Sequence, residues 1–438
     1  MSLPPKRFPV ELLDMVLAQQ SPHDLASASL VCQQWQCVAF PYLYRAMYLS
    51  EYAHLEVLAE RLSETNVPES LSVPAHLKCL AFGGSNINYI DSKDIDSIIS
   101  QLVNLTCFSW ELPFTPDRFD WFGACPNLEA VHLVPWYMWE NDDWIERLPQ
   151  LLTFTNLTHF SLKFEPLPYE NQDKAFEPLR LLIQSSPNLE SLILSFQVRD
   201  SAWATYSPTS VLESLGDQFV LPRLHTFHML GAADPDWYEF VSDPSNPFRA
   251  FLARHPSIRD LGIGCPVYFN PRAESVRMDP DELSRLLPSV KHLAFPSFMW
   301  ESVVKSELAS HLESLTISNL AFLFHGDPLR TIAETMGENS LPKVRKIAIL
   351  AQMGVVLLTI EALEAFLSAA KGLEELEFEF RIERAAGHER RKTRYRVIGG
   401  EWDLPSDIGE EEWDLTPGTS EGERDLTPGT SEGEGERE

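Results

Sequence analysis

Basic residues are scarce in this chain. Its 438 residues include 35 lysines and arginines against 64 aspartates and glutamates, which gives a formal charge of −29. A field of that sign repels phosphate backbones, so we expect no nucleic-acid binding by the bulk of the chain. The charge is uneven, because residues 401–438 hold 14 acidic and two basic side chains and account for −12 of it. The other residues make a mildly acidic body, and a hydrophobic content of 44% allows that body a core.

Long apolar runs and paired cysteines are also missing. The longest uncharged apolar stretch, residues 347–360, is shorter than the roughly 18–20 residues that a bilayer-spanning helix needs. Residues 1–7 lead into no apolar run of the kind found in signal peptides. The six cysteines form no C-x-x-C pair, and we expect buried thiols rather than disulfides. These absences predict an intracellular protein, cytoplasmic, nuclear or both, that does not contact a membrane.

Motifs that carry catalysis or bind cofactors are absent or misplaced. No G-x-G-x-x-G and no Walker loop occurs. Two G-x-S-x-G sequences, residues 418–422 and 429–433, lie in the acidic tail, which cannot form the strand, turn and helix that a hydrolase serine needs. His225 and His228 lie in a predicted strand with no third ligand nearby, so we expect no metal site. The sequence therefore predicts no enzyme, no catalytic residue and no cofactor.

An internal repeat is the dominant feature of the sequence. The pattern apolar-x-x-apolar-x-apolar recurs between Leu77 and Phe378 at intervals of 22 to 35 residues. Its eleven copies begin at Leu77, Leu105, Leu128, Leu157, Leu189, Leu224, Ile258, Val290, Leu312, Val344 and Leu373. The last three residues of each copy alternate inward, outward and inward, as a half-buried strand requires.

Amphipathic stretches between the copies predict helices. Residues 176–183 and 281–287 are two such stretches, and Asp279 or Asp281 can cap the second helix. A strand and a helix in each repeat resemble the leucine-rich repeat, whose units stack into a curved solenoid with a parallel sheet on the concave face. The predicted fold class is therefore α/β, with the helices outside. The outward strand positions, which would line the concave face, are Ala81, Ser109, His132, Ser161, Ile193, His228, Gly262, Ala294, Thr316, Ala348 and Glu377.

A different unit precedes the repeats, at residues 6–50. Three apolar residues form a helical stripe near its start: Val10, Leu13 and Leu17. Residues 21–30 and 31–39 predict two further short helices. Three helices of this size bury too little surface to be stable alone, so we expect an apolar edge to pack on the repeats or on another protein.

The motif in this unit runs Phe8-Pro9-x-Glu11-Leu12-Leu13, then Asp24-Leu25, then Leu30-Val31-Cys32-x-x-Trp35. It resembles the F-box, and the resemblance implies binding to the Skp-type adaptor of a cullin–RING ubiquitin ligase. The implied adaptor-binding positions are Pro9, Glu11, Leu12, Leu25, Val31, Cys32 and Trp35. Trp35 and Val31 have a second interpretation, because they can also form the small core of the three helices.

Aromatic residues crowd one stretch between predicted strands, with acidic residues beside them at 140, 142 and 143. One interpretation is aromatic packing that covers irregular repeats. The other is a recognition patch for a partner with apolar and basic groups. The candidates for target binding are His132, Trp136, Trp139, Trp144, His228 and Trp300.

The acidic tail repeats itself, since residues 425–434 copy residues 414–423. Its composition forbids a core and predicts disorder. Each copy resembles a proline-directed phosphodegron with Thr416 or Thr427 as the phosphate acceptor, and the alternative is a spacer without function. The basic residues 390–396 before the tail either fold back on it or act as a weak nuclear-import signal.

These observations predict four segments: an F-box at residues 6–50, a leucine-rich-repeat solenoid at 51–380, a basic connector at 381–400 and a disordered acidic tail at 401–438. The resemblance implies a substrate-recognition receptor of a Skp–cullin–F-box E3 ubiquitin ligase. Such a receptor binds the adaptor, through it the cullin, and a target protein. The alternative is a leucine-rich-repeat binding scaffold outside any ligase. The outward strand positions do not identify the target.

Overall fold

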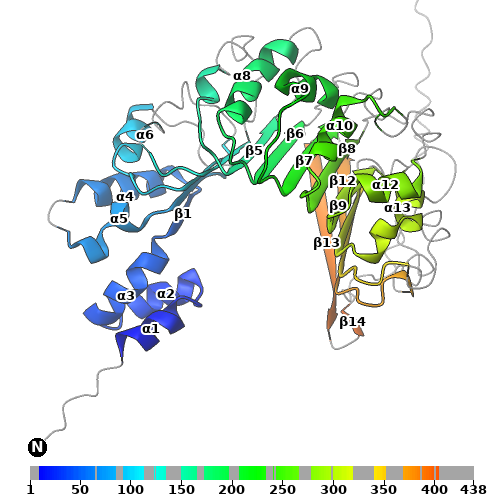
Figure 1. The fold of residues 1–438 in the computed structure, drawn as a ribbon. Coiled ribbons are helices and arrows are strands. Elements are labelled where there is room, and N and C mark those ends of the chain that lie inside the picture. The colour runs from blue at the N-terminus through cyan, green and yellow to red at the C-terminus, as the bar shows by residue number, and fades with distance from the viewer. Residues whose placement is uncertain are drawn as a thin grey trace, which may run out of the picture.

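The fold is an arch with helices along its outer side and strands lining its inner side (Figure 1). The computed structural model describes residues 9–64, 67–84, 92–112, 123, 125–134, 149–164, 172–196, 207–232, 240, 243–265, 278–296, 299–318, 340–351, 368–384, 387–398 and 401–403. The order of elements confirms the predicted class, which is a short helical unit followed by a curved α/β solenoid.

A single 14-stranded sheet runs the length of the solenoid, with its strands in sequence order. The first twelve strands are parallel to one another. They are β1 (Ala46–Leu49), β2 (Cys79–Phe82), β3 (Cys107–Trp110), β4 (Ala130–Leu133), β5 (His159–Phe164), β6 (Ser191–Phe196), β7 (Thr226–Ala232), β8 (Asp260–Cys265), β9 (His292–Pro296), β10 (Ser314–Ser318), β11 (Lys346–Ala351) and β12 (Glu375–Arg384). Every predicted repeat thus contributes one strand, and β1 precedes them.

Short helices connect successive strands and cover the outer side (Figure 1). They are α4 (Tyr52–Ser63), α5 (Val73–His76), α6 (Ser92–Ile99), α8 (Gln172–Gln184), α9 (Pro208–Leu215), α10 (Pro247–Arg254), α12 (Pro280–Leu286) and α13 (Trp300–Lys305), with 3-10 turns η1 (Glu69–Leu71) and η6 (Glu307–Ser310). The cap of α12 is Asp279, whose Oδ1 accepts hydrogen bonds from the amides of Asp281 at 2.8 Å and Glu282 at 3.2 Å. A carboxylate there satisfies amides that a helix start leaves unpaired. None of the described helices is long and apolar enough to span a bilayer.

The core is built from equivalent positions of every repeat. The middle apolar residue of the pattern is the second residue of each strand and is at most 2% exposed in all eleven copies: Leu80, Phe108, Val131, Phe160, Leu192, Phe227, Leu261, Leu293, Leu315, Ile347 and Leu376. Burial of each such side chain contributes roughly 1.5–3 kcal/mol. No repeat can bury this row alone, so each is stabilised by its neighbours.

One buried polar side chain ties two repeats together. His255 is 2% exposed and follows α10. Its Nε2 accepts the amide hydrogen of Leu221 at 2.9 Å, and its Nδ1 lies 2.7 Å from the carbonyl oxygen of Phe251, to which it donates. The ring also stacks on the Phe251 ring at 4.0 Å between centroids. Only the neutral imidazole can make both hydrogen bonds.

We therefore expect the free energy of unfolding to fall as the pH drops below about 6.5, the usual pKa of histidine. Burial lowers the pKa of His255 below that value. The two hydrogen bonds of His255 therefore contribute fully to the free energy of unfolding above about pH 6.5, and this contribution is lost as the pH falls toward the pKa of the folded state. Urea unfolding between pH 7.5 and pH 5 measures this. The variant His255→Gln has an amide that can make both hydrogen bonds but does not titrate. Its free energy of unfolding should therefore fall less between pH 7.5 and pH 5 than that of the wild type. Equal losses in the two proteins would contradict the assignment.

The end of the sheet differs from the predicted connector at residues 381–400. Strand β12 continues to Arg384, and β13 (Gly387–Ile398) returns antiparallel along it, followed by β14 (Glu401–Asp403). Alternating charges account for the pairing, because Glu375, Glu377 and Glu379 of β12 stand opposite Arg396, Arg394 and Lys392 of β13. Opposite charges at paired positions stabilise a sheet. The basic run is thus a strand, while the tail after Asp403, with Thr416 and Thr427, lies outside the described residues.

Candidate interaction surfaces

The N-terminal helices form a small unit with a core of its own. These helices are α1 (Val10–Leu17), α2 (Pro22–Ser29) and α3 (Gln33–Leu43). Their buried residues are Leu13, Leu17, Leu25, Ala28 and Ala39, against which Trp35, Val38, Tyr42 and Leu43 pack. The phenol of Tyr42 donates to Asp14 Oδ1 at 2.9 Å and fastens α3 to α1, and this hydrogen bond raises the pKa of Tyr42.

The same unit exposes an apolar surface, which we call the F-box patch. It consists of Leu12 (49% exposed), Met15 (69%) and Val16 (50%) on α1, and Leu30 (86%) and Val31 (61%) at the end of α2. On α1, Leu13 and Leu17 take the buried side, which leaves Leu12 and Val16 on another side one turn apart. Large aliphatic side chains exposed on so small a unit are typical of an interaction site rather than of a solvated surface.

The seven predicted adaptor-binding residues separate into two groups. Pro9, Glu11, Leu12, Val31 and Cys32 are exposed and accessible to a partner. Leu25 is 4% exposed and belongs to the core, so a contact role for it is wrong. Trp35 is half-buried against that core, which agrees with its structural interpretation, whereas the exposure of Val31 contradicts the same interpretation for Val31.

The predicted adaptor-binding positions did not include Met15, Val16 and Leu30. A signal for two of them was present in the sequence. Val16 follows Leu12 by one helical turn, and Leu30 directly precedes Val31. Apolar residues at such positions extend a contact surface along a helix.

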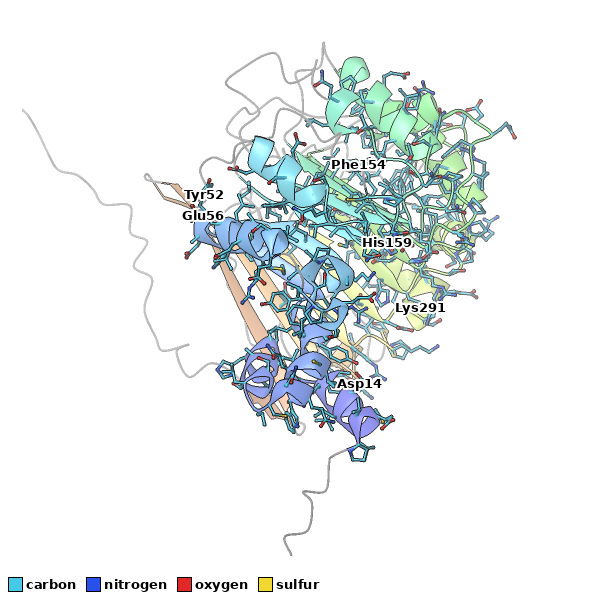
Figure 2. All side chains as sticks on the ribbon, turned by 90° about the vertical axis from the view of Figure 1, so that its left-hand side faces the viewer. Asp14, Tyr52, Glu56, Phe154, His159 and Lys291 are labelled. Carbon is cyan, nitrogen blue, oxygen red and sulfur yellow. The ribbon has the colours of Figure 1, made fainter. Side chains whose placement is uncertain are left out.

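Helix α3 joins this unit to the solenoid. Phe40 and Tyr44, at its C-terminal end, pack against the solenoid core and stack on each other at 4.2 Å between ring centroids. The ring of His76, in α5, meets Phe40 edge-on at 5.9 Å. In Figure 2, Asp14 marks α1, which lies below the solenoid in that view, and α3 leads from the helical unit up to the solenoid. Because one helix contributes to both cores, the orientation of the F-box patch relative to the sheet is fixed.

The concave face has the residues that the repeat pattern predicts. All eleven predicted outward positions fall in one register row that runs from Ala81 on β2 to Glu377 on β12. The side chains are mostly small, so the strand backbones are shallowly covered. His132 lies in this row, and burial lowers the pKa of its imidazole despite the carboxylate of Glu111 nearby.

Polar side chains are concentrated in the middle and C-terminal part of the concave face. His228 Nε2–H donates to Asp260 Oδ1 at 2.8 Å, and Gly262 makes room for this ring, because a Cβ there would lie 2.7 Å from His228 Cγ. Two strands further, His292 Nδ1 lies 2.8 Å from Ser314 Oγ. These groups are neighbours on successive strands and form a polar line across the face. Such a line fixes the register of a bound chain more than it adds affinity.

The N-terminal part of the face carries two neighbouring thiols. Cys79 and Cys107 are register partners on β2 and β3. Burial and the adjacent Cys79 raise the pKa of Cys107 to about 11. At neutral pH the Cys107 thiol is therefore protonated, and a protonated thiol is a poor nucleophile and metal ligand. Within the described residues, no three histidine, cysteine or acidic side chains gather where they could hold a metal ion.

The predicted target-binding residues have different outcomes. His132 and His228 lie on the concave face as predicted. Trp300 is 3% exposed and stacks on Phe295 at 6.0 Å between ring centroids, so it is part of the core and its proposed contact role is wrong. The aromatic cluster of Trp136, Trp139 and Trp144 lies outside the described residues.

Comparison with known proteins identifies the N-terminal unit. Residues 6–50 match the F-box-like family model. No curated protein matches the chain. Among solved structures, a Bacteroides fragilis protein is 16% identical over 75% of this chain and 72% of its own, with a TM-score of 0.30. The yeast complex of Rad7 and Elc1 contains a chain that is 12% identical over 84% of this chain and 92% of its own, with a TM-score of 0.38.

Proposed function

Because an F-box-like domain precedes a solenoid of repeats in this chain, we propose that it is a substrate-recognition receptor of a Skp–cullin–F-box E3 ubiquitin ligase. The F-box patch binds a Skp-type adaptor, and the adaptor connects the chain to a cullin. The concave face binds a target protein. The observation that carries the proposal is the exposure of the five aliphatic side chains of the F-box patch, all of them within the matched domain.

The receptor is non-catalytic in this proposal and acts by proximity. Holding a target close to a ubiquitin donor raises its effective concentration and converts a bimolecular encounter into a local one. The shared packing of α3 supports this role, since Phe40 and Tyr44 hold the solenoid in one direction relative to the adaptor. The chain would act in the cytoplasm, the nucleus or both.

The experiment that tests the proposal is co-purification of the tagged full chain from cells, with adaptor and cullin detected separately. We expect both, and we expect ubiquitin transfer to a captured target when the complex is supplied with activating and conjugating enzymes. Recovery of the adaptor without cullin would instead support the binding scaffold outside any ligase. Recovery of neither protein with a chain that is folded by circular dichroism would refute the proposal.

A further inference from the structure

Strand β13 lies next to the C-terminal edge of the sheet and is only partly paired on its outer side within the described residues. Along one side it pairs with β12 over ten positions, from Gly387 to Arg396. Along the other side, the only strand that the described residues supply is β14, which reaches Arg396, Val397 and Ile398. Within the described residues, the backbone groups of β13 that point away from β12 between residues 387 and 395 therefore have no strand beside them and can accept another extended segment. Such an edge is a template for strand addition.

The open edge is also basic in a chain that is strongly acidic. Five of the twelve residues of β13 are arginine or lysine and one is glutamate, against a net charge of −29 for the whole chain. The glutamates opposite do not offset this excess alone, because Glu375 and Glu377 of β12 also contact Lys346 Nζ, at 3.4 Å and 3.2 Å. By its sequence, β13 itself therefore carries four more basic than acidic residues.

The chain itself supplies a segment with matching charge at the matching place. Asp403 pairs with Arg396, so the following residue starts at the beginning of the open edge. Residues 404–438 contain 12 acidic and two basic side chains. These 35 residues are more than enough to follow the edge from residue 395 to residue 387, which at roughly 3.3 Å per residue is a short distance for them.

We propose that the acidic segment of residues 404–438 docks along the basic edge of β13. Its attachment beside the edge gives it a high effective concentration there, so weak individual charge contacts are sufficient. Docking shields the open edge from pairing with a second copy of the chain. A partner with an acidic extended segment has to displace the tail. Phosphate on Thr416 or Thr427 adds negative charge to the tail and so strengthens its binding to β13.

Hydrogen exchange of the β13 amides tests this proposal, with the full chain compared with a chain that ends at Asp403. We expect β13 to exchange roughly tenfold faster without the tail. A synthetic peptide of residues 404–438 should restore the protection when added to the shortened chain. Sodium chloride at about 0.5 M should remove most of the protection in both cases, because it screens exposed charges.

Matched variants locate the docking site. Lys392→Gln with Arg394→Gln should weaken peptide binding roughly tenfold, since each lost charge contact costs a fraction of a kcal/mol to about 1 kcal/mol. Arg61→Gln with Arg285→Gln removes the same charge from α4 and α12 and should leave binding unchanged. A peptide with its acidic residues replaced by asparagine and glutamine should not restore protection, and this result does not depend on how the β13 variant folds.

Three results would overturn the proposal: equal exchange with and without the tail at low salt, equal peptide binding by both double variants, or protection that rises with protein concentration. The last would assign the edge to a second copy of the chain. No adaptor is present in these measurements, so their outcome is independent of the proposed ligase function.

Discussion

Replacing Leu12 and Val31 by glutamate is expected to weaken adaptor binding by at least about 100-fold while the chain stays folded. Both side chains are about half exposed or more and lie outside the core of the helical unit. In a complex they would be buried, and residues at the centre of such interfaces contribute roughly 2–4 kcal/mol each. A carboxylate buried there without a partner adds a desolvation cost. Titration calorimetry with a purified Skp-type adaptor measures the loss.

Two further variants separate contact from folding. Val57→Glu places the same charge at an equally exposed aliphatic residue (54%) of α4 in the solenoid, and should bind the adaptor like the wild type. Leu25→Ala removes a core side chain and should lower stability by about 2–4 kcal/mol, with weaker binding only to the extent that the unit unfolds. Wild-type affinity in the Leu12 and Val31 double variant would show that the F-box patch is not the adaptor site.

The repeats were predictable because each one encodes its own strand locally. The spacing of the pattern indicates which residues are buried, and a period of two indicates that the residue between them faces outward. The stacking of parallel strands then aligns equivalent positions. Residues as different as Gly262, Ile193 and Glu377 therefore share one register row on the concave face.

The C-terminal hairpin could not be predicted in the same way. Taken alone, residues 390–396 are a run of positive charge and are typical of a solvated linker. They form a strand because Arg394 and Lys392 stand opposite Glu377 and Glu379, which becomes visible only when two distant segments are aligned. The period-two spacing of like charges in both segments was the available signal.

Contact residues were harder to predict than the fold, because an apolar residue type does not distinguish the core from a binding surface. Leu25 and Leu12 are both aliphatic residues of the F-box motif, yet one is 4% exposed and the other 49%. Trp300 was assigned to a surface from its aromatic neighbours and is instead stacked on Phe295. In a unit of three short helices, the packing angle decides which side is covered, and periodicity alone does not determine that angle.

Gly264→Ala is expected to weaken the contact between β7 and β8, so that the two halves of the solenoid unfold separately. The register of β7 and β8 shifts between Met229 and Ala232. A Cβ at residue 264 would lie 2.7 Å from the carbonyl oxygen of Met229 and 3.0 Å from that of Gly231. These are backbone atoms, so relief requires β7 to move. Gly231 itself has a φ of +95°, which suits glycine and limits alternative paths for the strand.

The cost of overpacking at one position is typically about 1–3 kcal/mol. In a solenoid each repeat is stabilised by its neighbours, so a weakened β7–β8 boundary lets the two halves unfold separately. We therefore expect urea denaturation of Gly264→Ala to show two transitions, or one that is broader and begins at lower urea, when followed by circular dichroism. Gly372→Ala is the control, because its new Cβ would lie 3.8 Å from the carbonyl oxygen of Val344, an ordinary contact. Identical curves for the two variants would mean that this boundary tolerates displacement, and that the two halves of the arch are held together by the remainder of the shared core.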